Sequence, residues 1–133
     1  MSKTALLFAG QGAQFVGMGR DLATQFPSAQ AWFDRANAAL GYDLAKVCWE
    51  GPESELTRTE HAQPGIFLVG WIAFELLKER VPGLTYAATA GLSLCEFTAL
   101  AAAGVMRFED ALRVVRQRGQ FMQEACEIGR AHV

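Results

Sequence analysis

Blocks of apolar and polar residues along this chain predict a strand, several helices, a second strand and two further helices. Residues 4–9 and 85–90 are short apolar runs typical of buried strands. Between them, apolar spacing predicts helices over residues 17–26 and 28–40, short helical pieces over 43–56, and a long buried helix over 64–80. Two helices follow, one ending at residue 103 and one covering 108–126. Helices between strands indicate an α/β fold with a parallel sheet.

Prolines and a serine mark several of these predicted helix boundaries. Pro27 separates the first two helices, and Ser28 is a predicted N-cap because its hydroxyl can accept a free backbone N–H. Gly51-Pro52 divides the short helical pieces. Pro64 is expected to open the long helix, since a proline in the first turn loses no hydrogen bond, and Pro82-Gly83 should end it.

The last predicted helix carries one apolar stripe with an arginine beside it. The stripe consists of residues three or four apart: Phe108, Ala111, Leu112, Val115, Met122 and Ala125. Arg118 lies next to it, and an inward guanidinium needs an anionic partner because leaving it unpaired is costly. That partner is either a carboxylate of the chain, such as Glu96, or a carboxylate of a bound substrate. Gly119 beside Arg118 permits another element to approach closely.

The strongest sign of chemistry is the segment 90–97, where an apolar strand reaches Gly91 and then Ser93 before a helix begins. A serine at a sharp strand-to-helix turn is held clear of the backbone, and free N–H groups there can bind an oxyanion. The usual pattern of this elbow has a second glycine where this chain has Cys95. A Gly-Leu-Ser turn without a catalytic role is therefore the alternative.

A second glycine-rich segment, residues 10–14, directly follows the first predicted strand. Its glycines allow a tight turn and a close approach to a ligand. It has neither the dinucleotide-binding nor the Walker spacing of glycines. The segment is thus either a plain strand-to-helix connection or a loop that supplies an oxyanion donor to Ser93.

Composition and charge exclude several classes of protein. The chain has 133 residues, a net charge of −2 and 51% hydrophobic residues, which fits one globular domain without a basic surface for nucleic acid. Its 3 cysteines have no metal-ligand spacing and are too few and odd in number for a disulfide framework. The longest apolar run, residues 65–74, is too short to cross a bilayer. We expect a cytoplasmic protein with no metal, membrane or nucleic-acid partner.

Three segments, taken in order, closely resemble the malonyl-CoA:acyl carrier protein transacylases, the acyltransferases of fatty-acid synthesis. They are residues 8–14, 91–97 and 116–123, and the resemblance extends from residue 4 to about residue 126. It implies the N-terminal part of the α/β-hydrolase-like large subdomain of the acyltransferase fold, with a parallel sheet and flanking helices. The ferredoxin-like small subdomain is missing. Acyltransferase segments of polyketide synthases share these motifs, and a non-catalytic fragment is a third interpretation.

The resemblance implies roles for five residues. Ser93 would be the nucleophile that takes up the malonyl group as an ester, and the backbone N–H groups of Gln11 and Leu94 would form the oxyanion hole. Arg118 would bind the malonyl carboxylate. Gln63 resembles a family position near the pocket, or it caps a helix. The implied partners are malonyl-CoA and phosphopantetheinylated acyl carrier protein, with no cofactor, and the full-length protein is expected to be a monomer.

The chain departs from the family pattern at two positions of the elbow. Leu92 stands where the family commonly has a histidine that is not the catalytic base. Cys95 stands where the family has glycine, and its side chain is expected to crowd the elbow by about 1–3 kcal/mol.

The catalytic histidine of the family belongs to a part beyond residue 126, and His61 is expected to be a surface residue. Residues 127–133 resemble the translation of a sequencing adapter, so we expect residues 1–126 to be the transacylase portion and 127–133, with His132, to be a non-native tail. A read error of the same origin is an alternative explanation of Cys95. Without the base, the chain alone is expected to turn over no substrate.

Overall fold

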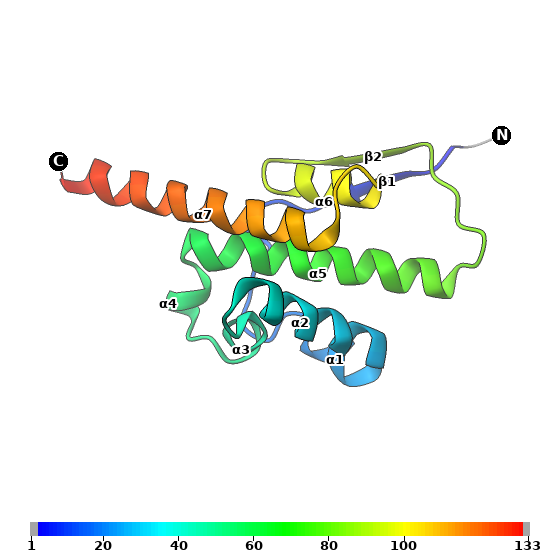
Figure 1. Cartoon of the computed structure of the whole chain (residues 1–133), viewed down its shortest axis with the longest axis horizontal. Coiled ribbons are helices and arrows are strands. Elements are labelled where there is room, and N and C mark those ends of the chain that lie inside the picture. The colour runs from blue at the N-terminus through cyan, green and yellow to red at the C-terminus, as the bar shows by residue number, and fades with distance from the viewer. Residues whose placement is uncertain (1–2, 132–133) are drawn as a thin grey trace.

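The computed structural model describes residues 3–131 and contains two parallel strands, with most of the helices on one side of them (Figure 1). Strand β1 (Ala5–Phe8) pairs with strand β2 (Ala88–Gly91), with Phe8 opposite Gly91. The connection between the strands contains five helices, as expected for a parallel pair that needs a long crossover. The predicted α/β class with a parallel sheet and flanking helices is confirmed.

Each predicted helical region is helical in the structure, with some differences in its ends. The helices are α1 (Arg20–Gln25), α2 (Pro27–Leu40), α3 (Leu44–Glu50), α4 (Glu53–Leu56), α5 (Thr59–Arg80), α6 (Cys95–Ala102) and α7 (Phe108–Ala131). Helix α1 is shorter than predicted because Gly17 and Gly19 have φ angles of 100° and 75°, which an α-helix does not allow. Helix α7 continues into the segment 127–133, whose origin stays a prediction, and His132 lies outside the described residues.

Two predicted helix starts are wrong. Helix α2 begins at Pro27, which fits the first helical position, so Ser28 is not its N-cap. The Ser28 hydroxyl instead donates a hydrogen bond to Glu79 Oε2 on α5, at 3.1 Å. Helix α5 begins at Thr59, and Pro64 is a fully buried residue inside it. Apolar spacing could not reveal this first turn because residues 59–61 are polar.

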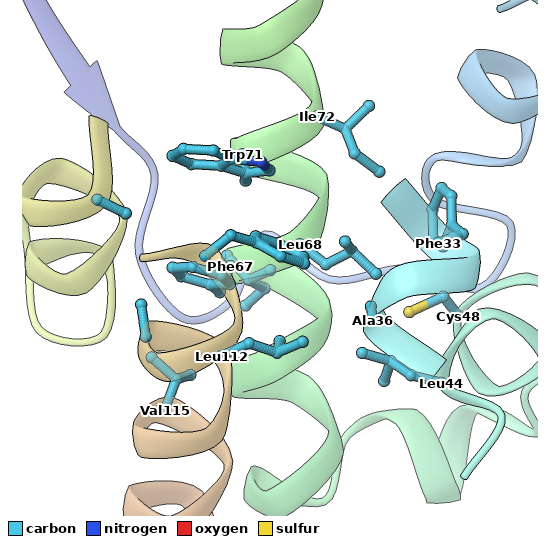
Figure 2. Packing of buried hydrophobic residues seen from close by; sticks show 14 of the residues in the cluster. Phe33, Ala36, Leu44, Cys48, Phe67, Leu68, Trp71, Ile72, Leu112 and Val115 are labelled. Atoms are coloured by element: carbon cyan, nitrogen blue, oxygen red, sulfur yellow. The ribbon is translucent and has the colours of Figure 1, made fainter. Parts of the chain in front are cut away.

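Helix α5 forms the centre of the hydrophobic core and lies between α7 on one side and α2 on the other (Figure 2). Phe67 on α5 and Leu112 on α7 have no exposed surface, and neither has Phe33 on α2. Aromatic rings join these layers, with the Trp32 and Phe108 ring centroids 4.8 Å apart. Burial of side chains this large stabilises a fold by about 1.5–3 kcal/mol each.

The two longest helices, α5 and α7, lie side by side, with α7 extending past the start of α5 (Figure 1). A Cβ atom on Gly119 would lie 2.6 Å from the Thr59 carbonyl oxygen, so the predicted close approach at this glycine is confirmed. Four members of the apolar stripe of α7 are buried: Phe108, Ala111, Leu112 and Val115. The prediction is wrong for Met122 and Ala125, which are exposed because the core ends before the last turns of α7.

Candidate active site

The turn between β2 and α6 holds Ser93 in a conformation that few serines adopt. Its φ angle is 58°, in the left-handed region, where a residue with a side chain stores about 1–3 kcal/mol of strain. The Cys95 N–H closes the turn by donating to the Leu92 carbonyl oxygen at 3.1 Å. A Cβ atom on Gly91 would lie 2.0 Å from the Cys95 carbonyl oxygen, so only glycine fits there. The Ser93 side chain is exposed at the tip.

The loop after β1 lies beside this elbow, because the paired strands β1 and β2 end together at Phe8 and Gly91. A Cβ atom on Gly10 would lie 3.5 Å from the Leu92 carbonyl oxygen. Within residues 3–131 no hydrogen-bond partner is found for the backbone N–H of Gln11 or of Leu94. The Leu94 N–H next to Ser93 and the Gln11 N–H in the neighbouring loop are therefore candidate oxyanion donors.

Arg118 reaches the elbow from α7. Its Nη2 donates to Ser93 Oγ at 2.8 Å, and its Nη1 donates to Gln63 Oε1 at 2.7 Å. Three of the residues singled out from the sequence thus meet, although they come from α5, α7 and the β2–α6 turn. The alternative ion pair with Glu96 is not found, and Arg118 forms no salt bridge with any carboxylate in the described part of the chain.

Gln63 is fully buried, and both ends of its carboxamide are engaged. Its Oε1 accepts from Arg118, and its Nε2 donates to Met122 Sδ at 3.2 Å. Gln63 does not cap a helix, because α5 begins four residues earlier at Thr59. The buried amide instead orients the Arg118 guanidinium toward Ser93.

A groove along α7 continues from Arg118 and has a volume of about 550 Å³. Its lining residues are Arg113, Val114, Gln117, Arg118, Phe121 and Met122. Phe121 is 58% exposed, a high value for an aromatic side chain. The apolar spacing of the sequence did not indicate this groove, because Val114 and Phe121 fall outside the stripe that faces the core.

His61 lies away from the elbow and has partners of its own. Its Nδ1 is 3.0 Å from the Glu55 carbonyl oxygen and 3.7 Å from the Glu55 carboxylate. The side chain is 19% exposed, so His61 is half-buried and still reaches solvent. Within residues 3–131 no histidine forms a hydrogen bond with Ser93. The described residues therefore provide a candidate nucleophile, candidate donors and a cation, without a base in contact with Ser93.

Cys95 is buried at the start of α6, and its Sγ is tightly packed against the carbonyl oxygen of Ala9, in line with the crowding expected at this position. Burial raises the pKa of this thiol, and the Thr98 hydroxyl offsets only part of the effect. The thiol is therefore protonated at neutral pH and is a poor nucleophile compared with a thiolate. Gly91 leaves room for it, since a Cβ there would be 2.9 Å from that of Cys95.

No group of three or more His, Cys, Asp and Glu side chains within residues 3–131 is arranged to hold a metal ion. None of the helices described here combines the length and apolar character needed to cross a bilayer.

The sequence matches the acyl transferase domain family over residues 5–132. The chain belongs to this family. It is 46% identical over 129 residues to a malonyl CoA-acyl carrier protein transacylase of Bacillus subtilis, covering 97% of this chain and 40% of the relative. It is 47% identical over 126 residues to a probable mitochondrial malonyl-CoA-acyl carrier protein transacylase of Drosophila melanogaster, covering 93% of this chain and 33% of the relative.

Solved structures give the same result for the fold. The malonyl transacylase of Streptococcus pneumoniae superposes with a TM-score of 0.87 at 46% identity, covering 92% of this chain and 39% of that one. A malonyl-transacylase in complex with an acyl carrier protein of a type II polyketide synthase gives a TM-score of 0.84 at 42% identity, covering 93% and 40%. The chain corresponds to the N-terminal part of this fold and spans at most about 40% of the length of these relatives.

Proposed function

We propose that this chain carries the nucleophile, the oxyanion donors and the carboxylate clamp of an enzyme that transfers malonyl groups from coenzyme A to acyl carrier protein. In the first half-reaction, Ser93 Oγ attacks the thioester carbonyl of malonyl-CoA. The N–H groups of Gln11 and Leu94 stabilise the oxyanion that forms. The tetrahedral intermediate then expels the coenzyme A thiolate, which takes up a proton, and leaves a malonyl ester on Ser93.

The observation that carries this proposal is the pair of hydrogen bonds from Arg118 to Ser93 and Gln63. Both partners are uncharged, so the guanidinium keeps its positive charge available beside the nucleophile. A malonyl group bound as a thioester ends in a free carboxylate, and arginine can bind a carboxylate through two parallel hydrogen bonds. Arg118 would therefore select malonyl over acyl groups without a carboxylate, and Gln63 would keep it in place.

In the second half-reaction, the phosphopantetheine thiol of acyl carrier protein attacks the Ser93 ester and releases the hydroxyl. Both half-reactions need a base for the attacking group, and a histidine usually provides it. We infer that this base belongs to the part of the fold that the relatives have beyond the aligned region. The chain by itself would then be inactive or very slow, since a general base is worth about 10²–10⁴ in rate.

The pathway that the malonyl group enters depends on the carrier protein. Fatty-acid synthesis is the proposed role, acting as a monomer in the cytoplasm. One solved relative is bound to a carrier protein of a polyketide synthase, which makes polyketide synthesis the second candidate. Purified carrier proteins of both kinds, offered to the enzyme in equal amounts, would distinguish the two roles by which one becomes malonylated faster.

The decisive experiment is to incubate the chain with malonyl-CoA and imidazole, which replaces the missing base, and to locate the adduct by mass spectrometry. We expect a malonyl mass on the peptide that contains Ser93, and none in Ser93→Ala. A malonyl mass on Cys95, or no adduct in a folded protein, would contradict the assignment. A hybrid of residues 1–126 with the remainder of the Bacillus subtilis relative repeats the test with a base in place.

A further inference from the structure

The carboxamide of Gln63 can hold Arg118 in only one of its two orientations. A guanidinium donates hydrogen bonds and accepts none, so the carbonyl oxygen of the amide must face it. After a half-turn about the last side-chain bond, Nε2 would face Arg118 and two donors would meet. The two orientations have nearly the same shape, so packing alone does not distinguish them. A second partner must therefore fix the carboxamide of Gln63.

Met122 is that partner. Its Sδ accepts a hydrogen bond from Gln63 Nε2 at 3.2 Å, and within residues 3–131 the Gln63 side chain has no other hydrogen-bond partner besides Arg118. A thioether sulfur accepts and has no hydrogen to donate. Reversal of the amide would therefore place Oε1 against the sulfur and Nε2 against the guanidinium. Because Gln63 has no exposed surface, bulk water does not compensate for either loss.

The place of Met122 on α7 follows from that of Arg118. Met122 lies four residues later, one turn along the same face of the helix. Gly119 between them lets α7 approach α5 closely, since a Cβ atom there would lie 2.6 Å from the Thr59 carbonyl oxygen. One helix thus supplies both the donor to Gln63 Oε1 and the acceptor from Gln63 Nε2.

Burial is not the main contribution of the Met122 side chain. Met122 is 38% exposed and lines the groove beside Arg118, whereas Met18 is 3% exposed and belongs to the core. A leucine at position 122 would have a similar volume but could not accept a hydrogen bond. What Met122 adds at this place is an acceptor for the Gln63 amide.

We propose that Met122 is a positioning residue for the carboxylate clamp: its thioether sulfur holds the Gln63 carboxamide with Oε1 toward Arg118, and so keeps the guanidinium beside Ser93. The role in substrate selection rests on the proposed function, whereas the contact and its effect on Arg118 do not. Selection of a malonyl group then depends on a side chain that has no charge and does not itself bind the carboxylate.

NMR of the unmodified 133-residue chain, with labelled methionine methyl groups, tests the contact. We expect a nuclear Overhauser effect between the Met122 ε-methyl group and the side-chain amide protons of Gln63. The methyl signal is assigned through its correlation with the Met122 backbone, so no variant is needed. A folded chain without this effect would overturn the proposal.

Variants at position 122 test the effect on Arg118. Met122→Leu removes the acceptor and should speed rotation of the Arg118 guanidinium about its Cζ–Nη bonds by about 3- to 10-fold, as expected from the loss of one hydrogen bond. The rate is read from the NMR line shapes of the guanidinium nitrogens. Met122→Gln restores an acceptor and should stay closer to the original chain. Met106→Leu, at a half-buried methionine just before α7, is the matched control. Unchanged rotation in Met122→Leu, or an equal increase in Met106→Leu, would contradict the proposal.

Acylation of Ser93 separates this proposal from the proposed function. With imidazole present, Met122→Leu should slow acylation by malonyl-CoA about 3- to 10-fold and acylation by acetyl-CoA less than about 2-fold. Met122→Gln should recover most of the malonyl rate. Equal slowing with both thioesters, or an unchanged malonyl rate, would refute a role in positioning the clamp. If the original chain is not acylated, the proposed function fails, and the NMR results still decide whether Met122 fixes Gln63 and Arg118.

Discussion

The side chains around α5 are buried, whereas those on the outer face of the sheet and on the outer side of α7 are exposed to solvent. Phe33, Phe67 and Leu112 are fully buried between α2, α5 and α7, whereas Leu7 on β1 is 79% exposed and Phe121 on α7 is 58% exposed. The candidate active site lies at the border between these regions. Gln63 and Gly119 attach Arg118 to the packed side, and Ser93 points to the open side. The packed region positions the candidate catalytic groups, and the open region leaves them accessible.

Large-to-small changes on the two sides should have very different effects on stability. Phe67→Ala should lower the free energy of unfolding by about 3–5 kcal/mol, because it leaves a cavity in the closed core. Phe121→Ala is the matched control and should change it by less than about 0.5 kcal/mol. Urea denaturation followed by circular dichroism measures both. Similar losses for the two variants would show that α7 is packed along its whole length.

Removing Arg118 should impair catalysis without loosening the core. In the hybrid enzyme, Arg118→Ala should lower kcat/KM for malonyl transfer. The loss of transition-state stabilisation should be about 1.5–3 kcal/mol, as expected for a charged hydrogen bond. Acetyl transfer should fall much less, because acetyl has no carboxylate. Arg116→Ala serves as the control, since Arg116 stacks on Tyr42 instead. Equal losses of malonyl and acetyl transfer would indicate a purely structural role for Arg118.

Substitutions at two glycines of α7 would show how far the close contact between α5 and α7 extends. Gly119→Ala should destabilise the protein by about 1–3 kcal/mol, because its Cβ would lie 2.6 Å from the Thr59 carbonyl oxygen. A Cβ atom at Gly129 would have no neighbouring atom within 4 Å, so Gly129→Ala should stabilise the helix by about 0.4–1 kcal/mol. Thermal unfolding distinguishes the two signs. Stabilisation by both substitutions would refute the close contact of α5 with α7.

The exposed face of the sheet should promote self-association. Leu7→Lys places a charge on this face and should reduce aggregation in light scattering, since charged residues protect exposed sheets from pairing. Leu100→Lys, on the 39% exposed Leu100 of α6, is the control for charge alone. If both substitutions reduce scattering equally, net charge explains the effect and the sheet face does not.

The smallest expected effect belongs to the ion pair of Arg35 and Glu109 on the packed side. Burial is the largest single influence and raises the pKa of the Glu109 carboxyl. The hydrogen bond from Arg35, a backbone hydrogen bond and the charges of Arg35 and Arg107 together outweigh it and leave the pKa below its ordinary value. The pair therefore stabilises the folded state at pH values above the pKa that Glu109 has in the unfolded chain. This contribution is lost as the pH falls through the lowered pKa of Glu109 in the folded chain. Glu109→Gln should cost less than about 1 kcal/mol at pH 7, because both groups are partly exposed.

A pH series of denaturation curves checks the sign of this effect. The difference between the original chain and Glu109→Gln should shrink as the pH falls below the ordinary glutamate pKa of about 4.3. A difference that grows as pH falls would contradict the lowered pKa.

Much of this structure could be predicted from the sequence because it depends on local patterns. Apolar spacing gave the element order, and the glycines and serine after the strands indicated the elbow and the facing loop. The start of α5 could not be predicted, since residues 59–61 are polar and their helix is stabilised by contacts with α7 at Gly119. Nor could the exposure of Met122, because periodicity defines a helix face without showing how far its partner extends.

In the candidate site, too, some features could be predicted from the sequence and others could not. Ser93 and Arg118 were recognisable from local pattern and from resemblance. Their hydrogen bond joins residues 25 positions apart, and that between Arg118 and Gln63 joins residues 55 apart. The contact between Cys95 and Ala9 spans 86 positions. No local signal encodes such pairs, which depend on how strands and helices pack.

The uncharged partners of Arg118 also have a consequence for the solution around the protein. A guanidinium without a counter-charge attracts any small anion that reaches it, so chloride, phosphate or acetate in the buffer would compete with the substrate. Raising their concentration should increase the apparent KM for malonyl-CoA without changing the rate at saturation. Two laboratories using different buffers would then measure different affinities for the same enzyme, and both values would be correct for their conditions.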